Sequence, residues 1–199
     1  MKIAVMSDIH GNIYALMKTL EDIDEQNVDK IICLGDLVGY GPHPNEVVAL
    51  IKRREIPCVK GNYDASVVDG DFTYIRNTAI NSFALPWACE EVRVANKYYL
   101  DSLPTSLKYT FNGVNMLLTH GSPNAINDYL FEDDEKTKEI MSQYEGDVLV
   151  CAHTHIPFAK KYNNKLLINV GSVGKPKIGK PNPTYALIEI NDNGEVKVT

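Results

Sequence analysis

Short apolar runs alternate with amphipathic segments along the N-terminal third of the chain. Residues 2–7 (KIAVMS), 30–35 (KIICLG) and 56–61 (IPCVKG) are mostly apolar, which predicts three strands buried on both faces. Between the first two runs, apolar residues recur at helical spacing and predict a helix over about residues 12–26. A second apolar stripe follows Pro44, a residue well suited to the first turn of a helix. This βαβαβ order predicts a parallel sheet with right-handed crossovers.

Residues 71–104 lose this alternation and are rich in aromatic side chains, which predicts helices. Two interpretations are open at this point: a helical layer packed on the edge of the sheet, or a helical cap insertion over the mouth of a site. We favour a segment that serves both purposes, with only its inner aromatic side chains near a substrate.

Strands dominate after Pro104. Asn112-Gly113 predicts a hairpin, and residues 133–145 predict a helix that begins with acidic residues. Further apolar runs predict strands over residues 147–153, 158–163, 165–172 and 184–191. We expect the last two in a second sheet packed against the first. Because no repeat, linker or low-complexity segment interrupts the chain, we expect a single domain over residues 1–199.

Composition narrows the range of partners. The net charge of -6 argues against a nucleic acid polymer, but metal ions can reverse the local sign of a site, so a small phosphorylated substrate remains compatible. No apolar run approaches membrane-spanning length, and the N-terminal segment turns polar after Met6, too soon for a secretory leader. We therefore expect a cytoplasmic protein without membrane association. The sequence leaves homo-oligomer formation open. Its four cysteines, which lack CxxC spacing, predict free thiols.

Each predicted buried strand ends in polar side chains. The residues at these ends include Asp8, His10, Asp36, Asn62, Asp64, His120, His153 and His155. In open α/β sheets, ligands bind at the carboxyl ends of the strands, so we expect these residues to converge at one edge of one sheet. The chain has five histidines and four of them lie at these ends, which is hard to assign to chance.

The chemistry of these side chains suits metal ions. Imidazoles mixed with oxygen donors, without thiolates, favour a first-row divalent metal over calcium or magnesium. Seven ligands are too many for one tetrahedral ion and suit two ions that share a bridging carboxylate. The expected ligands are Asp8, His10, Asp36, Asn62, His120, His153 and His155.

Five motifs occur in a fixed order over residues 7–155: SDIH, LGDLVGYG, KGNYD, LTHGSP and CAHTH. Together they resemble the calcineurin-like metallophosphoesterase superfamily. The longer stretches DIHGN, THGSP and NVGSVGKPKIGKPNPTYAL resemble its prokaryotic phosphodiesterase-like branch over almost the whole chain. The resemblance implies an α/β fold of the four-layer α/β/β/α sandwich type, here with a helical cap over about residues 71–104.

The resemblance also implies roles for the ligands. One ion would be held by Asp8, His10, Asp36 and His155, and the other by Asp36, Asn62, His120 and His153. Asp36 would bridge the two ions. The implied activity is hydrolysis of phosphoesters, with phosphodiesters or nucleotides favoured, by a hydroxide that bridges the metals. Manganese is the favoured metal, with iron, nickel, cobalt or zinc as alternatives.

Two positions depart from the family pattern. Ala152 stands where a glycine is usual, which asks only for a tolerable backbone angle. Tyr63 stands where the family has a histidine that, with the following acid, is implied to protonate the leaving group. The resemblance thus places Asp36, Asn62, Tyr63 and Asp64 in catalysis. A phenol with an ordinary pKa near 10 is a weak acid at pH 7, however, and Asp64 is equally interpretable as a turn or capping residue.

Three further predictions concern the surroundings of the site. Asn12 is interpreted as a helix cap that could also reach a substrate phosphate, and Ser172 as a substrate-binding residue in a turn that closes the site. Lys175, Lys177 and Lys180 lie in a Gly/Pro-rich loop beyond a strand end. Solvated charges are the simpler explanation of these lysines, and contact with a substrate is the alternative. The departure at Tyr63 keeps a second hypothesis open: a metal-binding scaffold or regulatory protein on the same fold, with weak or no catalysis. Retention of all seven ligands favours the enzyme.

Overall fold

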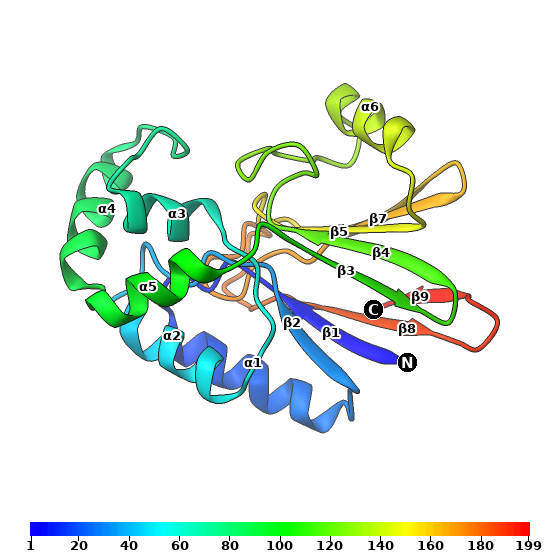
Figure 1. Cartoon of the computed structure of the whole chain (residues 1–199), viewed down its shortest axis with the longest axis horizontal. Helices are drawn as coiled ribbons and strands as arrows, with labels where there is room; N and C mark the ends of the chain where they lie inside the picture. Colours follow the sequence, from blue (N-terminus) through cyan, green and yellow to red (C-terminus); the bar gives the residue numbers. More distant parts are fainter.

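Two β-sheets lie face to face between helices in the computed structural model, which describes residues 1–199 (Figure 1). The first sheet has the order β2-β1-β8-β9, with bounds β1 Lys2–Met6, β2 Lys30–Cys33, β8 Ala186–Ile190 and β9 Val196–Val198. The second has the order β3-β4-β5-β7-β6, with bounds β3 Ser106–Phe111, β4 Val114–Thr119, β5 Val148–Cys151, β6 Phe158–Tyr162 and β7 Lys165–Asn169. Helices α1 (Ile13–Glu25) and α2 (Pro44–Arg53) cover the first sheet, and α6 (Glu135–Gln143) covers the second (Figure 1). The expected four-layer α/β/β/α sandwich is confirmed.

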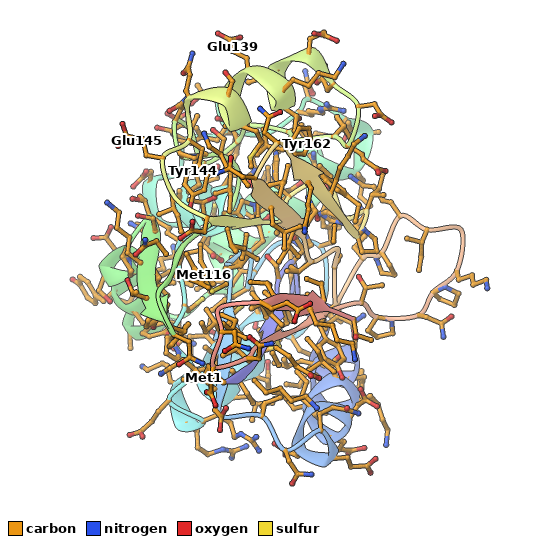
Figure 2. The ribbon with its side chains drawn as sticks, turned by 90° about the vertical axis from the view of Figure 1, so that its right-hand side faces the viewer. Met1, Met116, Glu139, Tyr144, Glu145 and Tyr162 are labelled. Atoms are coloured by element: carbon orange, nitrogen blue, oxygen red, sulfur yellow. The ribbon has the colours of Figure 1, made fainter.

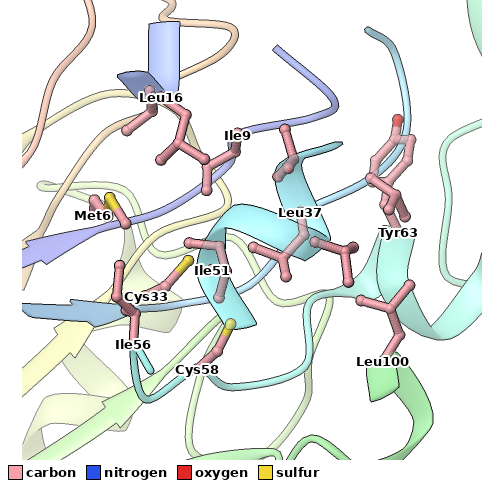
Figure 3. Packing of buried hydrophobic residues seen from close by; sticks show 14 of the residues in the cluster. Met6, Ile9, Leu16, Cys33, Leu37, Ile51, Ile56, Cys58, Tyr63 and Leu100 are labelled. Carbon is pink, nitrogen blue, oxygen red and sulfur yellow. The ribbon is translucent and has the colours of Figure 1, made fainter. Parts of the chain in front are cut away.

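Buried apolar side chains fill the three spaces between these four layers. Met6 of β1 packs with Leu16 of α1 and Ile51 of α2 in the space below the first sheet (Figure 3). Ile3 and Val5, on the opposite face of β1, pack between the sheets with residues of β4, β5 and β7. Because β1 is buried on both faces, its sequence is a continuous apolar run rather than an alternating one.

The third space lies between the second sheet and α6. Ile140 and Met141 of α6 pack there against Leu149 of β5. Tyr144 and Tyr162 lie under the same helix, as Figure 2 shows from the side of the molecule, and the Tyr144 hydroxyl donates to the carbonyl of Val148 at 2.7 Å. This layer fixes the position of β5, whose carboxyl end carries two of the expected metal ligands.

One strand assignment and one sheet assignment from the sequence are wrong. The run at residues 56–61 contributes only an isolated bridge between Cys33 and Cys58, because Pro57 has no N–H for a ladder and the chain turns into a helix directly afterwards. The run at residues 184–191 forms β8, which pairs antiparallel with β1 in the first sheet rather than joining the second. The first sheet is therefore mixed, not parallel.

Three helices gather at the end of the sandwich where β1 and β2 end (Figure 1). They are α3 (Asn62–Asp69), α4 (Ala79–Glu91) and α5 (Val94–Ser102). The latter two confirm helices in the segment 71–104, while α3 begins where the sequence predicted a turn.

All four cysteines are free thiols, as expected. No helix combines the length and apolar character needed to cross a membrane.

Candidate metal centre

The predicted ligands converge, but they come from two sheets rather than from one edge of a single sheet. Asp8 follows β1 and Asp36 follows β2 in the first sheet, whereas His120 follows β4 and His153 follows β5 in the second. All four are buried. The face-to-face packing of the sheets is what brings the two sets of strand ends together.

The backbone around these ligands is strained in a consistent way. Five of the nine non-glycine residues with positive φ are predicted ligands, with φ between 50° and 65°: Asp8, His10, Asp36, His153 and His155. Such left-handed conformations cost about 1–3 kcal/mol each and cluster at functional sites. Ala152 is not among the positive-φ residues, so alanine replaces the usual glycine there without backbone strain.

The first group of ligand atoms belongs to Asp8, His10 and His155. Oδ1 of Asp8 lies 3.0 Å from Nε2 of His155 and 3.6 Å from Nε2 of His10, and the two Nε2 atoms are 3.3 Å apart. Each imidazole directs its other nitrogen, Nδ1, at a backbone carbonyl: His10 at that of Val38 and His155 at that of Lys175. An Nδ1–H that donates to a carbonyl leaves a lone pair on Nε2. Three electron-rich atoms therefore face one another.

The second group belongs to Asp36, His120 and His153. Nε2 of His120 lies 3.5 Å from Oδ2 of Asp36, 3.2 Å from Nδ1 of His153 and 2.9 Å from Oδ1 of Asn62. The amide nitrogen of Asn62 donates to the carbonyl of Tyr74, which turns the amide oxygen toward the site. Asn62 thus directs an amide oxygen at this group, and its role as a ligand stays a prediction.

Asp36 lies between the two groups. Its Oδ1 accepts the backbone N–H of Tyr63 at 2.8 Å, while its Oδ2 lies 3.6 Å from Nε2 of His10 and 3.5 Å from Nε2 of His120. Neither Oδ2 of Asp36 nor Oδ1 of Asp8 has a hydrogen-bond donor, although both are buried. Orphaned carboxylate oxygens surrounded by imidazole nitrogens fit a pair of divalent cations.

The pKa shifts of the candidate ligands also indicate that the buried carboxylates favour positive charge in the site. Burial on its own would lower the pKa of His120, but Asp36 and Asp8 raise it to about 10. Burial would likewise raise the pKa of Asp8, but His155 and His120 hold it well below its ordinary value. Burial and the neighbouring His120 lower the pKa of His153 to about 3, so this ring is neutral. The negative charges of Asp36 and Asp8, which favour a proton on His120, would equally favour a bound metal cation.

Gly61 allows the loop that carries Asn62 to approach Asp36 closely. A Cβ at this position would lie 2.1 Å from Oδ1 of Asp36 and 2.2 Å from its backbone nitrogen. Real Cβ atoms do not approach other atoms so closely, so any larger residue would displace the carboxylate of Asp36. The close approach delivers Asn62 at the first position of α3.

Tyr63 lies beside the site but its hydroxyl is occupied. The ring packs with Leu37 and Leu100, with its hydroxyl directed away from these apolar side chains (Figure 3). The hydroxyl donates to Oδ1 of Asn81 at 2.8 Å and also pairs with the hydroxyl of Tyr40. Burial, and then Tyr40, raise the pKa of Tyr63 above its ordinary value. Both observations make this phenol a poorer acid than a free tyrosine.

Asp64 is fully buried and is bound by three backbone N–H groups. Its Oδ1 accepts from Leu37 at 2.9 Å and Val38 at 3.3 Å, and its Oδ2 accepts from Gly61 at 3.0 Å. These contacts tie the loop after Asp36 to the start of α3. Of the two interpretations left open by the sequence, the geometry supports the capping role.

Asn12 and Ser172 also have structural partners. Asn12 caps α1 through Ala15 and donates to the carbonyl of Gly174 at 3.2 Å. Ser172 is fully buried, donates to the carbonyl of Asp8 at 2.8 Å and accepts the N–H of Lys175 at 2.9 Å. Neither side chain lines the cavity described next, so substrate contact by either stays a prediction.

A cavity of about 240 Å³ opens beside Asn62, His153 and His155. The segment 71–104 does reach its mouth, but not through aromatic side chains as expected: the residues that it contributes are Ile75, Arg76, Thr78, Ile80 and Asn81. The remaining wall includes Tyr40, Tyr63, Tyr129, Lys175 and Lys177. Sequence reasoning did not assign Arg76, Tyr40 or Tyr129, and no periodicity or motif marks Arg76 or Tyr129.

Comparisons with known proteins agree with this geometry. The model of the calcineurin-like phosphoesterase superfamily domain matches residues 1–193. Protein MJ0912 of Methanocaldococcus jannaschii is 35% identical over 207 residues, which cover 96% of this chain and 83% of that protein. The phosphodiesterase YfcE of Escherichia coli is 27% identical, with coverage of 96% and 94%. A metallophosphoesterase structure from Sphaerobacter thermophilus superposes with a TM-score of 0.82 at 27% identity, covering 100% of this chain and 86% of that one. The chain belongs to the calcineurin-like phosphoesterase superfamily.

Proposed function

We propose that the protein hydrolyses small phosphoesters, with phosphodiesters or nucleotides favoured, and that it does so with two divalent metal ions. Asp8, His10 and His155 would hold one ion, Asn62, His120 and His153 the other, and Asp36 would lie between them. The observation that carries this proposal is Oδ2 of Asp36, which is buried, has no hydrogen-bond donor and lies 3.6 and 3.5 Å from imidazole nitrogens of the two groups.

Two bound divalent ions would supply an activated water at neutral pH and positive charge for the phosphoryl oxygens. The side chains of this protein supply the orientation. Carbonyls fix the ring orientations of His10, His120 and His155 through their Nδ1 atoms, and the N–H of Tyr63 fixes Asp36. The donor set favours manganese, iron, cobalt, nickel or zinc, with manganese as our first expectation.

Protonation of the leaving group is the weak step in this proposal. Tyr63 occupies the position of the expected histidine, but its proton is donated to Asn81 and its pKa is raised. We therefore expect the highest activity on esters whose leaving groups depart without a proton. A Tyr63→His variant should raise kcat/KM most for esters with poor leaving groups. An equal gain for good and poor leaving groups would show that the new imidazole is not acting as an acid.

The test of the function is turnover by the protein loaded in turn with manganese, iron, cobalt, nickel and zinc. Bis(p-nitrophenyl) phosphate and p-nitrophenyl phosphate would be compared, because their kcat/KM ratio decides between diester and monoester preference. Asp36→Asn should abolish turnover with both, whereas Asp192→Asn, an exposed acid in the β8–β9 turn, should leave it unchanged. Absence of turnover with every metal would refute the proposed enzymatic function.

The alternative, a metal-binding scaffold on this fold, predicts a different combination of results. Metal titration would still give two equivalents per chain, and Asp36→Asn would still weaken binding, but no phosphoester would be hydrolysed. Metal stoichiometry and turnover measured on the same preparation therefore separate the two functions.

A further inference from the structure

Three cationic side chains lie at the mouth of the cavity beside the metal ligands. Arg76 comes from the segment before α4, and Lys175 and Lys177 come from the loop before β8. All three line the cavity that also exposes His153 and His155. Two separate segments of the chain thus contribute positive charge to one rim.

None of these cations has a carboxylate partner. The ion pairs of the protein involve other lysines and Arg54, and none of them includes Arg76, Lys175 or Lys177. This is notable because the chain has 26 acidic residues against 20 basic ones. Lys175 is half-buried and Lys177 is exposed. Burial, and then the nearby charge of Lys177, lower the pKa of Lys175. An anion between these like charges would be favoured by all of them, and most by the half-buried Lys175.

Aromatic rings hold two of the cations in place. The guanidinium of Arg76 lies 4.2 Å from the ring centroid of Tyr129, and that ring lies 4.0 Å from the imidazole of His153. The ammonium of Lys175 lies 3.2 Å from the ring centroid of Tyr40. Cation–π contacts of this kind attract the charge without neutralising it. They position Arg76 and Lys175 and leave their donors available to a ligand.

The scissile phosphate alone does not account for this much positive charge. Two divalent ions held by the carboxylates of Asp8 and Asp36 keep a net positive charge, and the three cations of the rim add to it. A phosphodiester brings only a single negative charge to the metals. The rim therefore has an excess of donors that a second anionic group would use.

We propose that Arg76, Lys175 and Lys177 form a second anion subsite, and that the natural substrate carries a second phosphate group next to the phosphate that would be attacked at the metal centre. This proposal rests on the proposed function, because it places the scissile phosphate at the metal centre. Planar guanidinium and flexible ammonium donors are both well suited to phosphate oxygens. A cavity of about 240 Å³ is smaller than typical pockets for drug-sized ligands, so it takes the phosphates while the rest of the substrate extends past the rim.

The test is calorimetric titration of the metal-loaded protein, freed of excess metal, with two pairs of ligands. AMP is compared with ADP, whose second phosphate is linked through an anhydride. Propyl phosphate is compared with propane-1,3-diyl bisphosphate, whose second phosphate is linked through carbon. We expect the bisphosphorylated member of at least one pair to bind at least tenfold more tightly, and the pair that shows the effect identifies the linkage. A ratio below tenfold for both pairs would overturn the proposal.

The Arg76→Gln/Lys177→Gln double variant tests the residues. It should reduce the affinity ratio to about one while leaving the binding of propyl phosphate within threefold of the wild type. Lys180→Gln is the matched control, because Lys180 is exposed in the same loop but lies outside the cavity. A ratio that survives in the double variant would show that these cations do not bind the second phosphate.

Binding and turnover are measured separately, so the two proposals can fail separately. Tight binding of the second phosphate without hydrolysis of any ester would refute the enzyme and keep the subsite. Hydrolysis of simple diesters with affinity ratios near one would refute the subsite and keep the enzyme.

Discussion

Removal of the Asp64 carboxylate is the sharpest test of how the site is built. Asp64→Ala deletes the acceptor of three buried N–H groups, those of Leu37, Val38 and Gly61. These groups belong to the loop after Asp36 and to the cap of α3. If the role of Asp64 is to hold these two segments together, the main effect of the substitution should be a lower free energy of unfolding. A direct loss of catalysis in the folded protein is not expected.

The size of the loss follows from these contacts. A buried N–H left without an acceptor costs about 1–3 kcal/mol, so three of them set a scale of about 3–9 kcal/mol. Part of this is offset, because burial and then the charge of Asp36 raise the pKa of Asp64 and make the native carboxylate itself costly. We expect a net loss of about 3–5 kcal/mol for Asp64→Ala. Asp64→Asn keeps one acceptor oxygen and should lose about 1–2 kcal/mol.

The assay is urea unfolding of the metal-free protein, followed by far-UV circular dichroism. Asp69→Asn is the control, since Asp69 is an exposed acid of the same helix and a surface substitution there should stay within about 0.5 kcal/mol. If Asp64→Ala were as stable as the wild type but inactive, the capping interpretation would be wrong and Asp64 would belong to the chemistry. Asp64→Asn covers the case in which the alanine variant fails to fold.

Three further predictions concern the rest of the site. Gly61→Ala should weaken metal binding at least tenfold by isothermal titration, because its Cβ would collide with Asp36, whereas Gly70→Ala, with nothing within 4 Å of its added Cβ, should bind metal normally. Ser172→Ala should lower stability by about 1–2 kcal/mol through loss of its bond to the carbonyl of Asp8, with KM unchanged; a raised KM at wild-type stability would instead indicate substrate contact. Metal added at a hundred times its Kd should stabilise the apoprotein by about 2.7 kcal/mol for each ion bound, or about 5–10 °C in Tm for each, and EDTA should reverse this; a Tm that does not respond would exclude metal binding to the native state.

The residues that converge at the candidate metal centre could be found from the sequence because their signal is local. A buried strand is an apolar run, and the first polar residues after it must lie at its carboxyl end. Asp8, Asp36 and His120 are identified by this rule without knowledge of which strands pair. The rule also survives an error in the topology, since the ligands converge even though they come from two sheets.

Strand pairing depends on residues far apart in the chain, so the sequence pattern did not predict which sheet each strand joins. β7 and β8 are apolar runs of the same length, yet β7 pairs with β5 in the second sheet and β8 pairs with β1 in the first. The choice depends on packing with distant residues, which a pattern along the chain does not encode. The position of Arg76 beside the site could not be predicted for a related reason. Arg76 lies in an irregular segment without periodicity, and only the fold places it near His153.

The occupied hydroxyl of Tyr63 and the cationic rim point to the same substrate chemistry. Tyr63 donates its proton to Asn81, so a substrate that needs protonation of an alkoxide would react slowly here. A leaving group that ends in phosphate has a pKa near 6 and departs as a stable anion without an acid. A second phosphate linked through an anhydride would provide such a leaving group, and Arg76, Lys175 and Lys177 would stabilise its negative charge as the bond breaks. This reasoning favours ADP over propane-1,3-diyl bisphosphate in the titrations. A substrate of this kind would also let a phosphoesterase site with all seven predicted ligands work with tyrosine in place of the expected histidine.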